Sequence, residues 1–174
     1  MSTLREEILS VRSKREASVL VKKFMNHQYE VSELMDLFFS DDWVTCQKAS
    51  WPITLLADKR PDWFYPYIES MLINLDRPHH DAVVRNTVRT WEAMNPLPPE
   101  WQGPIYDKSF AYFSDPQYAA AIRVFSMTVC SNIAMAHPAL AEEIIPIIED
   151  HWDHATAAWR SRGRKELKRL RKLI

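Results

Sequence analysis

The chain has 174 residues, of which 47% are hydrophobic and 26% are charged, and these values are ordinary for one globular domain. It has only two glycines, Gly103 and Gly163, which argues against Rossmann turns, phosphate-cradling loops and tight β-hairpins, because all of these need glycine. Its two cysteines, Cys46 and Cys130, are isolated and fit a reducing compartment better than a disulfide framework. No secretory leader and no apolar run of the ~20 residues that a membrane span needs is evident, so we expect a cytoplasmic protein.

The net charge of −1 is unevenly distributed along the sequence. Residues 160–174 contain eight basic residues and one acid, Glu166, and carry a charge of +7, which leaves −8 on the rest of the chain. A basic end of this kind predicts contact with an acidic or polyanionic partner. The candidate polyanion contacts are Arg160, Arg162, Arg164, Lys165, Lys168, Arg169, Arg171 and Lys172.

Apolar residues recur at helical spacing along nearly the whole chain, and no segment is typical of a strand. In the first half, Ser40-Asp41-Asp42 is a suitable N-cap for a long helix, and Pro52 inside that helix is expected to kink it. The Arg77-Pro78 step should end the helix that precedes it. The predicted helices of this half cover residues 3–12, 14–26, 31–39, 42–59 and 61–75.

The second half continues the pattern with helices over 79–95, 99–113, 115–136 and 139–154, followed by the basic segment. The proline-rich connection over 95–99 is the only candidate linker, and it is too short to separate two domains. We therefore predict an all-α protein of about ten helices that forms one domain over residues 1–174. Its parts would be N-terminal cap helices (1–30), stacked helix pairs (31–159) and a basic C-terminal helix (160–174).

A spacing of 19 residues separates a proline in a predicted helix from a later basic residue three times: Pro66 and Arg85, Pro104 and Arg123, Pro146 and Lys165. Lys48 lies 37 residues before Arg85, which lies 38 before Arg123. Self-similarity at about 40 residues is typical of stacked helix pairs, which form an α-solenoid.

The pattern resembles the HEAT and armadillo-like repeat families over roughly residues 31–172. The segments that end at Pro66, Pro104 and Pro146 are similar to the bent first helix of a HEAT unit. Asp42 lies six residues before Lys48, as in the HEAT motif, whereas His79 and Gln117 replace the aspartate in the next two repeats. The resemblance implies an α-α superhelix and a non-catalytic scaffold that binds a protein or peptide. The basic position of the repeat is occupied by Lys48, Arg85, Arg123 and Lys165.

The layout is also similar to short bacterial HEAT-like proteins that share the helix Gln47-Lys48-Ala49-Ser50-Trp51. Some of these carry the label adenylosuccinate lyase. The lyase superfamily has a flexible loop with a Met-Pro-x-Lys-x-Asn core, and this sequence has no such loop. The resemblance therefore implies no lyase activity here.

In a stacked array, the second helices of the pairs would line a concave face. Arg123 has a second interpretation, because a basic residue in mid-helix can instead bond turn carbonyls or an acid of the neighbouring repeat. The candidate binding surface predicted from the sequence consists of Gln47, Lys48, Arg85, Arg89, Arg123 and Asn132.

The alternative function is nucleic-acid binding through the basic C-terminal helix, with the competing interpretation that this helix is only a terminal cap. Some HEAT-like proteins are alkylpurine DNA glycosylases, in which aromatic residues surround a catalytic aspartate. The tryptophans of this chain could stack on bases or could fill the core. Those considered are Trp43, Trp51, Trp91, Trp101 and Trp159.

The histidines, serines and cysteines are the candidates for metal-binding and nucleophilic sites. His151 and His154 would share one helical face, and His79-His80-Asp81 forms a second group, but neither is accompanied by a recognised metal motif. No glycine-rich elbow surrounds a serine, and no sequence signal lowers the pKa of a cysteine. The sequence therefore predicts no catalytic residue, no metal and no cofactor.

Overall fold

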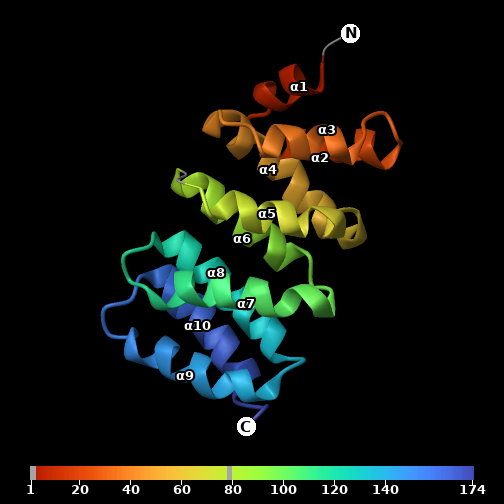
Figure 1. The fold of residues 1–174 in the computed structure, drawn as a ribbon. Coiled ribbons are helices and arrows are strands. Elements are labelled where there is room, and N and C mark those ends of the chain that lie inside the picture. Colours follow the sequence, from red (N-terminus) through yellow and green to blue (C-terminus); the bar gives the residue numbers. More distant parts are fainter. Residues whose placement is uncertain (1–2, 78–79) are drawn as a thin grey trace. The chain divides into compact units, whose positions relative to one another are not determined.

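The computed structural model describes residues 3–77 and 80–174. Within these ranges the chain forms ten α-helices and three short 3-10 helices, and no strand (Figure 1). The chain divides into two compact units, one up to Met94 and one from Asn95 onward. This boundary lies in the proline-rich connection, and the single domain expected from the sequence stays a prediction.

The N-terminal unit follows the predicted helices closely. Asp42 is the N-cap of α4, and its carboxylate accepts hydrogen bonds from the backbone N–H groups of Val44 and Thr45 at 3.2 and 3.3 Å. Pro52 lies inside α4, as expected. The helices of this unit are α1 (Leu4–Ser10), α2 (Lys14–Met25), α3 (Val31–Phe38), α4 (Trp43–Ala57), α5 (Ile68–Leu75) and α6 (Asp81–Ala93).

The predicted helix over 61–75 is shorter than expected, because α5 begins only at Ile68. The preceding residues form two 3-10 turns, η1 (Pro61–Trp63) and η2 (Tyr65–Tyr67). Each has a proline in its first turn, and short-range bonds such as Phe64 N–H to Pro61 C=O, at 3.0 Å, close them. Proline has no N–H to donate to a regular α-helical ladder, so the chain enters α5 through these tighter turns. The predicted stop at Pro78 and the predicted start at His79 lie outside the described residues.

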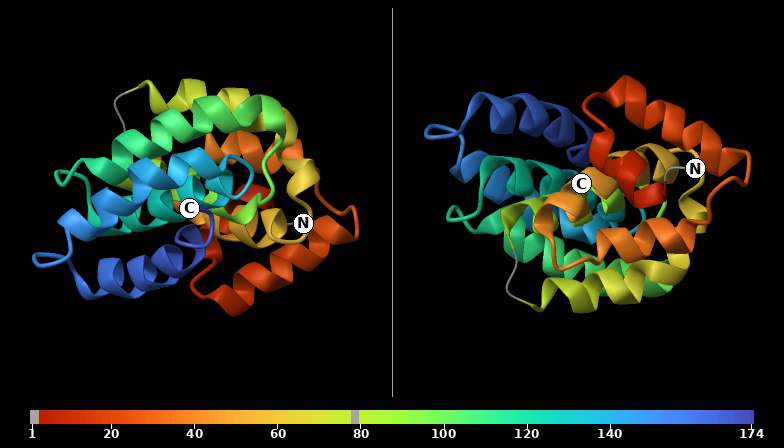
Figure 2. Two further views of the ribbon diagram at one scale, coloured as in Figure 1. Left: turned by 90° about the horizontal axis from the view of Figure 1, so that it is seen from below. Right: turned by 90° about the horizontal axis from the view of Figure 1, so that it is seen from above.

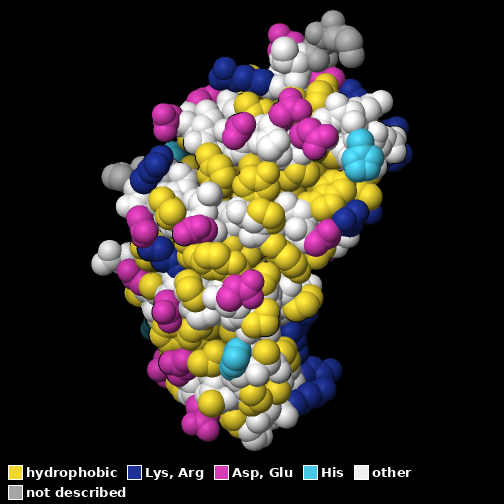
Figure 3. Space-filling view, turned by 45° about the vertical axis from the view of Figure 1, so that its right-hand side comes forward, with side chains coloured by type: hydrophobic (Ala, Val, Ile, Leu, Met, Phe, Trp, Pro, Cys, Tyr) yellow, Lys and Arg dark blue, Asp and Glu magenta, His cyan; other side chains and the backbone are white. Residues whose placement is uncertain are grey.

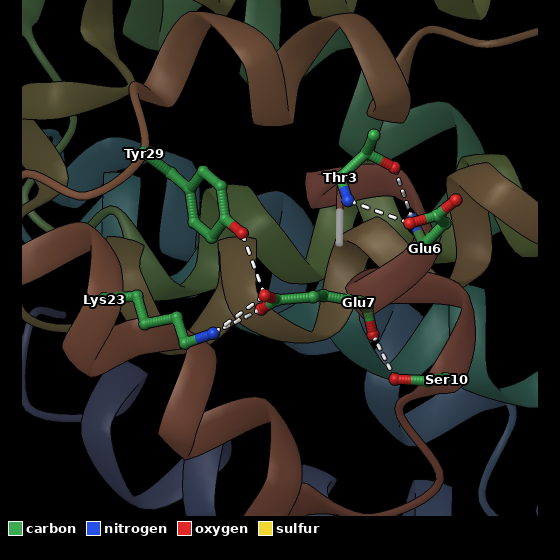
Figure 4. Close-up of polar contacts among 6 residues, drawn as sticks. All are labelled: Thr3, Glu6, Glu7, Ser10, Lys23 and Tyr29. Atoms are coloured by element: carbon green, nitrogen blue, oxygen red, sulfur yellow. Dashed lines mark hydrogen bonds and ion pairs between the residues drawn. The ribbon is translucent and has the colours of Figure 1, made fainter. Parts of the chain in front are cut away.

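Helix α1 is fixed to its neighbours by polar contacts (Figure 4). Thr3 and Glu6 form a reciprocal capping box at its start. The Glu7 carboxylate accepts a hydrogen bond from the Tyr29 hydroxyl at 2.9 Å and pairs with the Lys23 ammonium at 2.7 Å. These contacts tie α1 to α2 and to the turn after α2, and the role of these helices as a cap stays a prediction.

The C-terminal unit consists of α7 (Pro99–Ser114), α8 (Ala120–Ala134), η3 (Pro138–Leu140), α9 (Ala141–Asp150) and α10 (Ala157–Leu170). Pro104 and Pro146 lie inside α7 and α9, as the repeat pattern predicts. Figure 2 shows α9 and α10 side by side, joined by one loop. Helix α10 packs on both α8 and α9, and its buried residues are Trp159, Gly163, Glu166, Leu167 and Leu170.

Two helix boundaries in this unit differ from the prediction. Helix α8 begins at Ala120 and not near residue 115, because the Asp115 carboxylate accepts the Gln117 N–H at 2.8 Å and holds the chain in a turn. Helix α9 ends at Asp150 and not at residue 154, and His151 is its C-cap. His151 Nδ1 lies 2.9 Å from the Ile147 carbonyl and bonds one of the last carbonyls of α9.

None of the described helices combines the length and apolar character that a membrane crossing requires.

Candidate functional site

Two of the four predicted repeat cations bond a carbonyl at the end of an earlier helix. The Lys48 ammonium donates to the carbonyl of Val11, the C-cap of α1. Arg123 Nε donates to the Phe113 carbonyl, in the last turn of α7, at 3.2 Å. Carbonyls at a helix C-terminus have no partner within the helix, and cations are favoured there. In the sequence analysis Arg123 is expected either to line the concave binding face or to bond a turn carbonyl. The structure shows the bond to a carbonyl.

The other two repeat cations are placed differently. Arg85 lies on α6, where its Nε donates to Asn86 Oδ1 at 3.4 Å. Lys165 is exposed on α10. The four positions are therefore equivalent in sequence spacing but not in their contacts.

A pocket of about 240 Å³ lies in the N-terminal unit on the second helices of three successive pairs. Ala17, Trp51 and Leu55 supply apolar surface, and Lys14 and Arg89 supply two cations. Helix α4 packs against both α2 and α6, which places these side chains on one surface. We call this surface the α2–α4–α6 groove. It is lined by Lys14, Ala17, Trp51, Thr54, Leu55 and Arg89.

A third cation adjoins the groove through Trp51. The Lys48 ammonium lies 5.8 Å from the centroid of the Trp51 ring, at a distance where a cation and an aromatic face attract. The groove thus combines an aromatic surface with positive charge. Many Asp and Glu side chains lie elsewhere on the surface of the same unit (Figure 3). An apolar floor with a few charged groups at its edge is the usual composition of a recognition surface.

The predicted binding surface is only partly brought together. Arg89 lines the groove, and Lys48 adjoins it, whereas Gln47 and Arg85 lie half-buried outside its lining. Arg123 and Asn132 belong to the C-terminal unit. Trp51 was predicted to stack on bases or to fill the core and not to line a peptide groove, although its position one helical turn after Lys48 on α4 indicates that the two share a face.

The basic helix α10 is attached to α8 by a buried polar network. The Glu166 side chain is completely buried, and Arg169 donates to its Oε2 at 2.6 Å. Arg169 also donates to Asn132 Oδ1 at 2.9 Å, and the Arg162 guanidinium donates to the Thr128 hydroxyl. The burial of Glu166 was not predicted from the sequence, yet this residue lies three residues after Gly163 and four before Leu170, on the apolar stripe of α10.

A second pocket, with a volume of about 600 Å³, lies between the end of α9 and α10. Trp152 is part of its lining, and the Arg164 guanidinium lies 6.0 Å from the centroid of the Trp152 ring. Arg171 pairs with Glu149 at 2.5 Å. Figure 3 shows Lys and Arg side chains gathered at one edge of this unit. We call this surface the α9–α10 face, and it is lined by Glu149, Trp152, Arg164, Leu167, Lys168 and Arg171.

The tryptophans considered for base stacking are not equally available. Trp91 and Trp159 are 1% and 2% exposed and belong to the core. Trp43 is 44% exposed, and its ring stacks on that of His80 at 4.5 Å. Trp51 and Trp101 are partly exposed. Two of the five tryptophans, Trp91 and Trp159, are therefore not available to stack on a base.

The histidine and cysteine candidates form neither a metal-binding cluster nor an activated thiol in the described residues. His154 lies beyond the end of α9, so the expected i, i+3 pair with His151 on one helix is wrong. No group of three potential metal ligands occurs in the described ranges, and His79 lies outside them. Burial raises the pKa of the Cys46 thiol to about 12 and that of Cys130 well above its ordinary value. Neither thiol is therefore an activated nucleophile at neutral pH.

Comparison with known proteins places this architecture in one family. No curated protein and no solved structure matches the sequence. A family model for the HEAT repeat domain matches residues 4–169, which is nearly the whole chain and includes both units. The fold of that family is an α-α superhelix, in agreement with the helical repeats described above. The chain belongs to the HEAT repeat domain family.

Proposed function

We propose that the protein is a non-catalytic scaffold that binds a peptide segment of a partner protein in the α2–α4–α6 groove. The observation that carries this proposal is the position of Trp51, which shares a pocket with apolar residues of α2 and α4 and with the cations Lys14 and Arg89, and which lies close to Lys48. HEAT repeats are typically protein-interaction scaffolds, which supports the same class of function.

The chemistry of the groove specifies the kind of peptide. Trp51 and Leu55 offer apolar surface, which favours an aliphatic or aromatic side chain. Lys14, Lys48 and Arg89 add positive charge close to that surface. An acidic residue next to an apolar anchor would complement both features. We therefore expect a short acidic peptide with at least one large apolar residue.

The proposal can be tested by selecting peptides from a random displayed library and measuring their affinity for groove variants. Trp51→Ala and Arg89→Gln should each weaken binding by about tenfold or more, because central aromatic and arginine residues dominate interface energetics. Trp43→Ala and Arg15→Gln are matched controls on the same unit but outside the groove. Selected peptides that bind all four variants equally well would refute the groove as the binding site.

A second candidate function is nucleic-acid binding through α10. The α9–α10 face favours it, since Trp152 lies beside Arg164 and Lys168, and an aromatic ring next to cations suits a base and its phosphate. The pairing of Arg169 with Glu166 and of Arg171 with Glu149 lowers the number of cations that can neutralise phosphates. These contacts favour the cap role of α10, although the two roles are compatible.

Binding to labelled DNA and RNA across a salt series tests this candidate. Counterion release predicts a steep fall in affinity with salt if several phosphates are contacted. The double variant Arg164→Gln and Lys168→Gln should then reduce both the affinity and the slope. No binding at low salt would exclude nucleic acid as the ligand.

A cytoplasmic location, expected from the sequence, agrees with the two free buried cysteines.

A further inference from the structure

The guanidinium of Arg123 has fewer acceptors than it can use. Its Nε bonds the Phe113 carbonyl at 3.2 Å, and its centre lies 4.3 Å from the ring of Trp159. Its Nη2 is buried and has no hydrogen-bond partner among the described residues. Burial lowers the pKa of this guanidinium, and the charge of Asp115 partly opposes that effect. A cation in such surroundings is stabilised by an additional anion close by.

Arg123 lines a pocket of about 340 Å³ in the C-terminal unit. The pocket lies where the connection between α7 and α8 meets the connection between α9 and α10. Its size is in the range of pockets that hold small molecules. It is distinct from the α9–α10 face, with which it shares no lining residue. The lining consists of Pro116, Tyr118, Ala120, Arg123, Asp150, His151, His154, Ala155, Thr156 and Trp159.

Two helices begin at this pocket. Ala120 is the first residue of α8, a helix of 15 residues, and its N-cap residue, Ala119, has no side-chain hydrogen bond to the first turn. Thr156 is the N-cap of α10, which has 14 residues. The first N–H groups of a helix lack intrahelical partners and carry partial positive charge, which favours anions.

Two imidazoles complete the polar part of the lining. His151 Nδ1 bonds the Ile147 carbonyl at 2.9 Å, and a carbonyl only accepts, so Nδ1 carries a proton and Nε2 of the neutral ring is an acceptor. His154 is exposed at the pocket. Asp150 is the acid on the lining, and it opposes anion binding. The Arg123 guanidinium, the uncapped N-terminus of α8 and the exposed His154 are set against Asp150 on the lining and the charge of Asp115, which acts on Arg123.

We propose that this pocket binds the phosphate group of a small phosphate monoester. Its donors come from several elements: the guanidinium of Arg123, the open N–H groups of α8 and the exposed imidazole of His154. A carboxylate has two acceptor oxygens, whereas a phosphate monoester has three and more negative charge, so phosphate matches this set better. The ring of Trp159 gives the pocket an apolar wall beside the charged group.

The test is a titration of the whole ¹⁵N-labelled protein with inorganic phosphate, followed by NMR, with acetate and chloride at matched ionic strength. Phosphate should shift the backbone amides of Ala120, Ala121 and Ile122 in a saturable manner, and acetate should do so more weakly. Arg123→Gln should raise the Kd for phosphate about tenfold or more. Lys165→Gln removes one charge from an exposed site outside the pocket and should leave the Kd unchanged within about twofold.

Ala120→Pro provides a test that does not depend on Arg123. Proline is tolerated at the first position of a helix and removes one N–H from the pocket, and Ala119 already has the extended conformation (ψ 142°) that a following proline requires. This variant and His154→Ala should each weaken phosphate binding about threefold or more while the far-UV spectrum stays helical. Absence of saturable shifts with phosphate, equal shifts with chloride, or an unchanged Kd in Ala120→Pro and His154→Ala would overturn the proposal, even if Arg123→Gln does not fold.

Discussion

Gly163 is the residue where α10 comes closest to the end of α9. A Cβ at this position would lie 3.0 Å from Ile148 Cγ2 and 3.0 Å from Trp152 Cζ3, so both neighbours would have to move. In an exposed helix, alanine is favoured over glycine by about 1 kcal/mol. We expect the crowding to outweigh this preference, so that Gly163→Ala lowers the free energy of unfolding by about 1 kcal/mol in urea titrations.

The exposed Ser161 on the same helix provides the control, and Ser161→Ala should change the stability by less than about 0.5 kcal/mol. If Gly163→Ala were stabilising by about 1 kcal/mol, α10 would not pack against Trp152 as described.

The pair formed by Glu166 and Arg169 is asymmetric in its burial. The side chain of Glu166 is 0% exposed, whereas that of Arg169 is 31% exposed. Arg169→Ala leaves a buried carboxylate without its cation and should destabilise the protein by about 3–5 kcal/mol. Glu166→Gln leaves a cation that water can reach, and we expect a smaller loss of about 1–3 kcal/mol. Urea unfolding of both variants checks the order, and a larger loss for Glu166→Gln would contradict it.

At the scale of elements, the N-cap of α4 predicts a dependence on pH. The pKa of Asp42 is lowered, chiefly because the Thr45 hydroxyl donates to its carboxylate, and backbone N–H groups add to the effect. A lowered pKa stabilises the folded state above the ordinary value of 3.8, and this contribution is lost as the pH falls through the folded-state pKa. Asp42→Asn keeps a good N-cap but removes the titration.

The wild type should therefore be more stable than Asp42→Asn at pH 6, and the difference should shrink as the pH falls below 3.8. Urea titrations of both proteins between pH 6 and 3 measure this trend. A difference that grows in acid would show that the carboxylate does not cap α4.

Most helices could be predicted because their apolar residues repeat with helical spacing and their caps are recognisable. Ser13 and Asp42 are suitable N-cap residues, and α2 and α4 begin directly after them. The boundaries that failed depend on bonds that spacing does not reveal. Asp115 holds a turn before α8, and His151 ends α9 by bonding a carbonyl. Prolines at residues 61 and 66 convert the start of a predicted helix into 3-10 turns.

The candidate sites were predicted less completely, because they depend on which helix faces come together. The repeat spacing correctly marked Lys48 and Arg123 as cations of one kind, and both bond carbonyls at helix ends. It did not distinguish them from Arg85 and Lys165, whose local contacts differ. Trp51 and Arg89 line one groove only because α4 packs against α6, and a single sequence does not contain that contact.

At the scale of the whole molecule, each unit contains one buried cysteine. Cys46 lies in α4 and Cys130 in α8, with 1% and 0% exposure. Because the pKa of the Cys46 thiol is about 12 and that of Cys130 is also raised, neither should react with iodoacetamide at pH 8 until its unit opens. If the chain is one cooperative domain, both thiols should become reactive at the same urea concentration, as measured by mass spectrometry of the alkylated peptides. Reaction of one cysteine at clearly lower urea would show that the two units unfold separately.

The central claim is that partner binding belongs to the α2–α4–α6 groove and that α10 acts mainly as a structural cap. The most direct measurement is the affinity of one selected acidic peptide for two variants, each of which is first shown to be folded. Trp51→Ala combined with Arg89→Gln should weaken binding by about 100-fold or more. Lys165→Gln combined with Lys168→Gln and Lys172→Gln should change it by less than about threefold, because these exposed side chains lie on α10 or just beyond its end. The opposite order, with the larger loss in the α10 variant, would contradict the account.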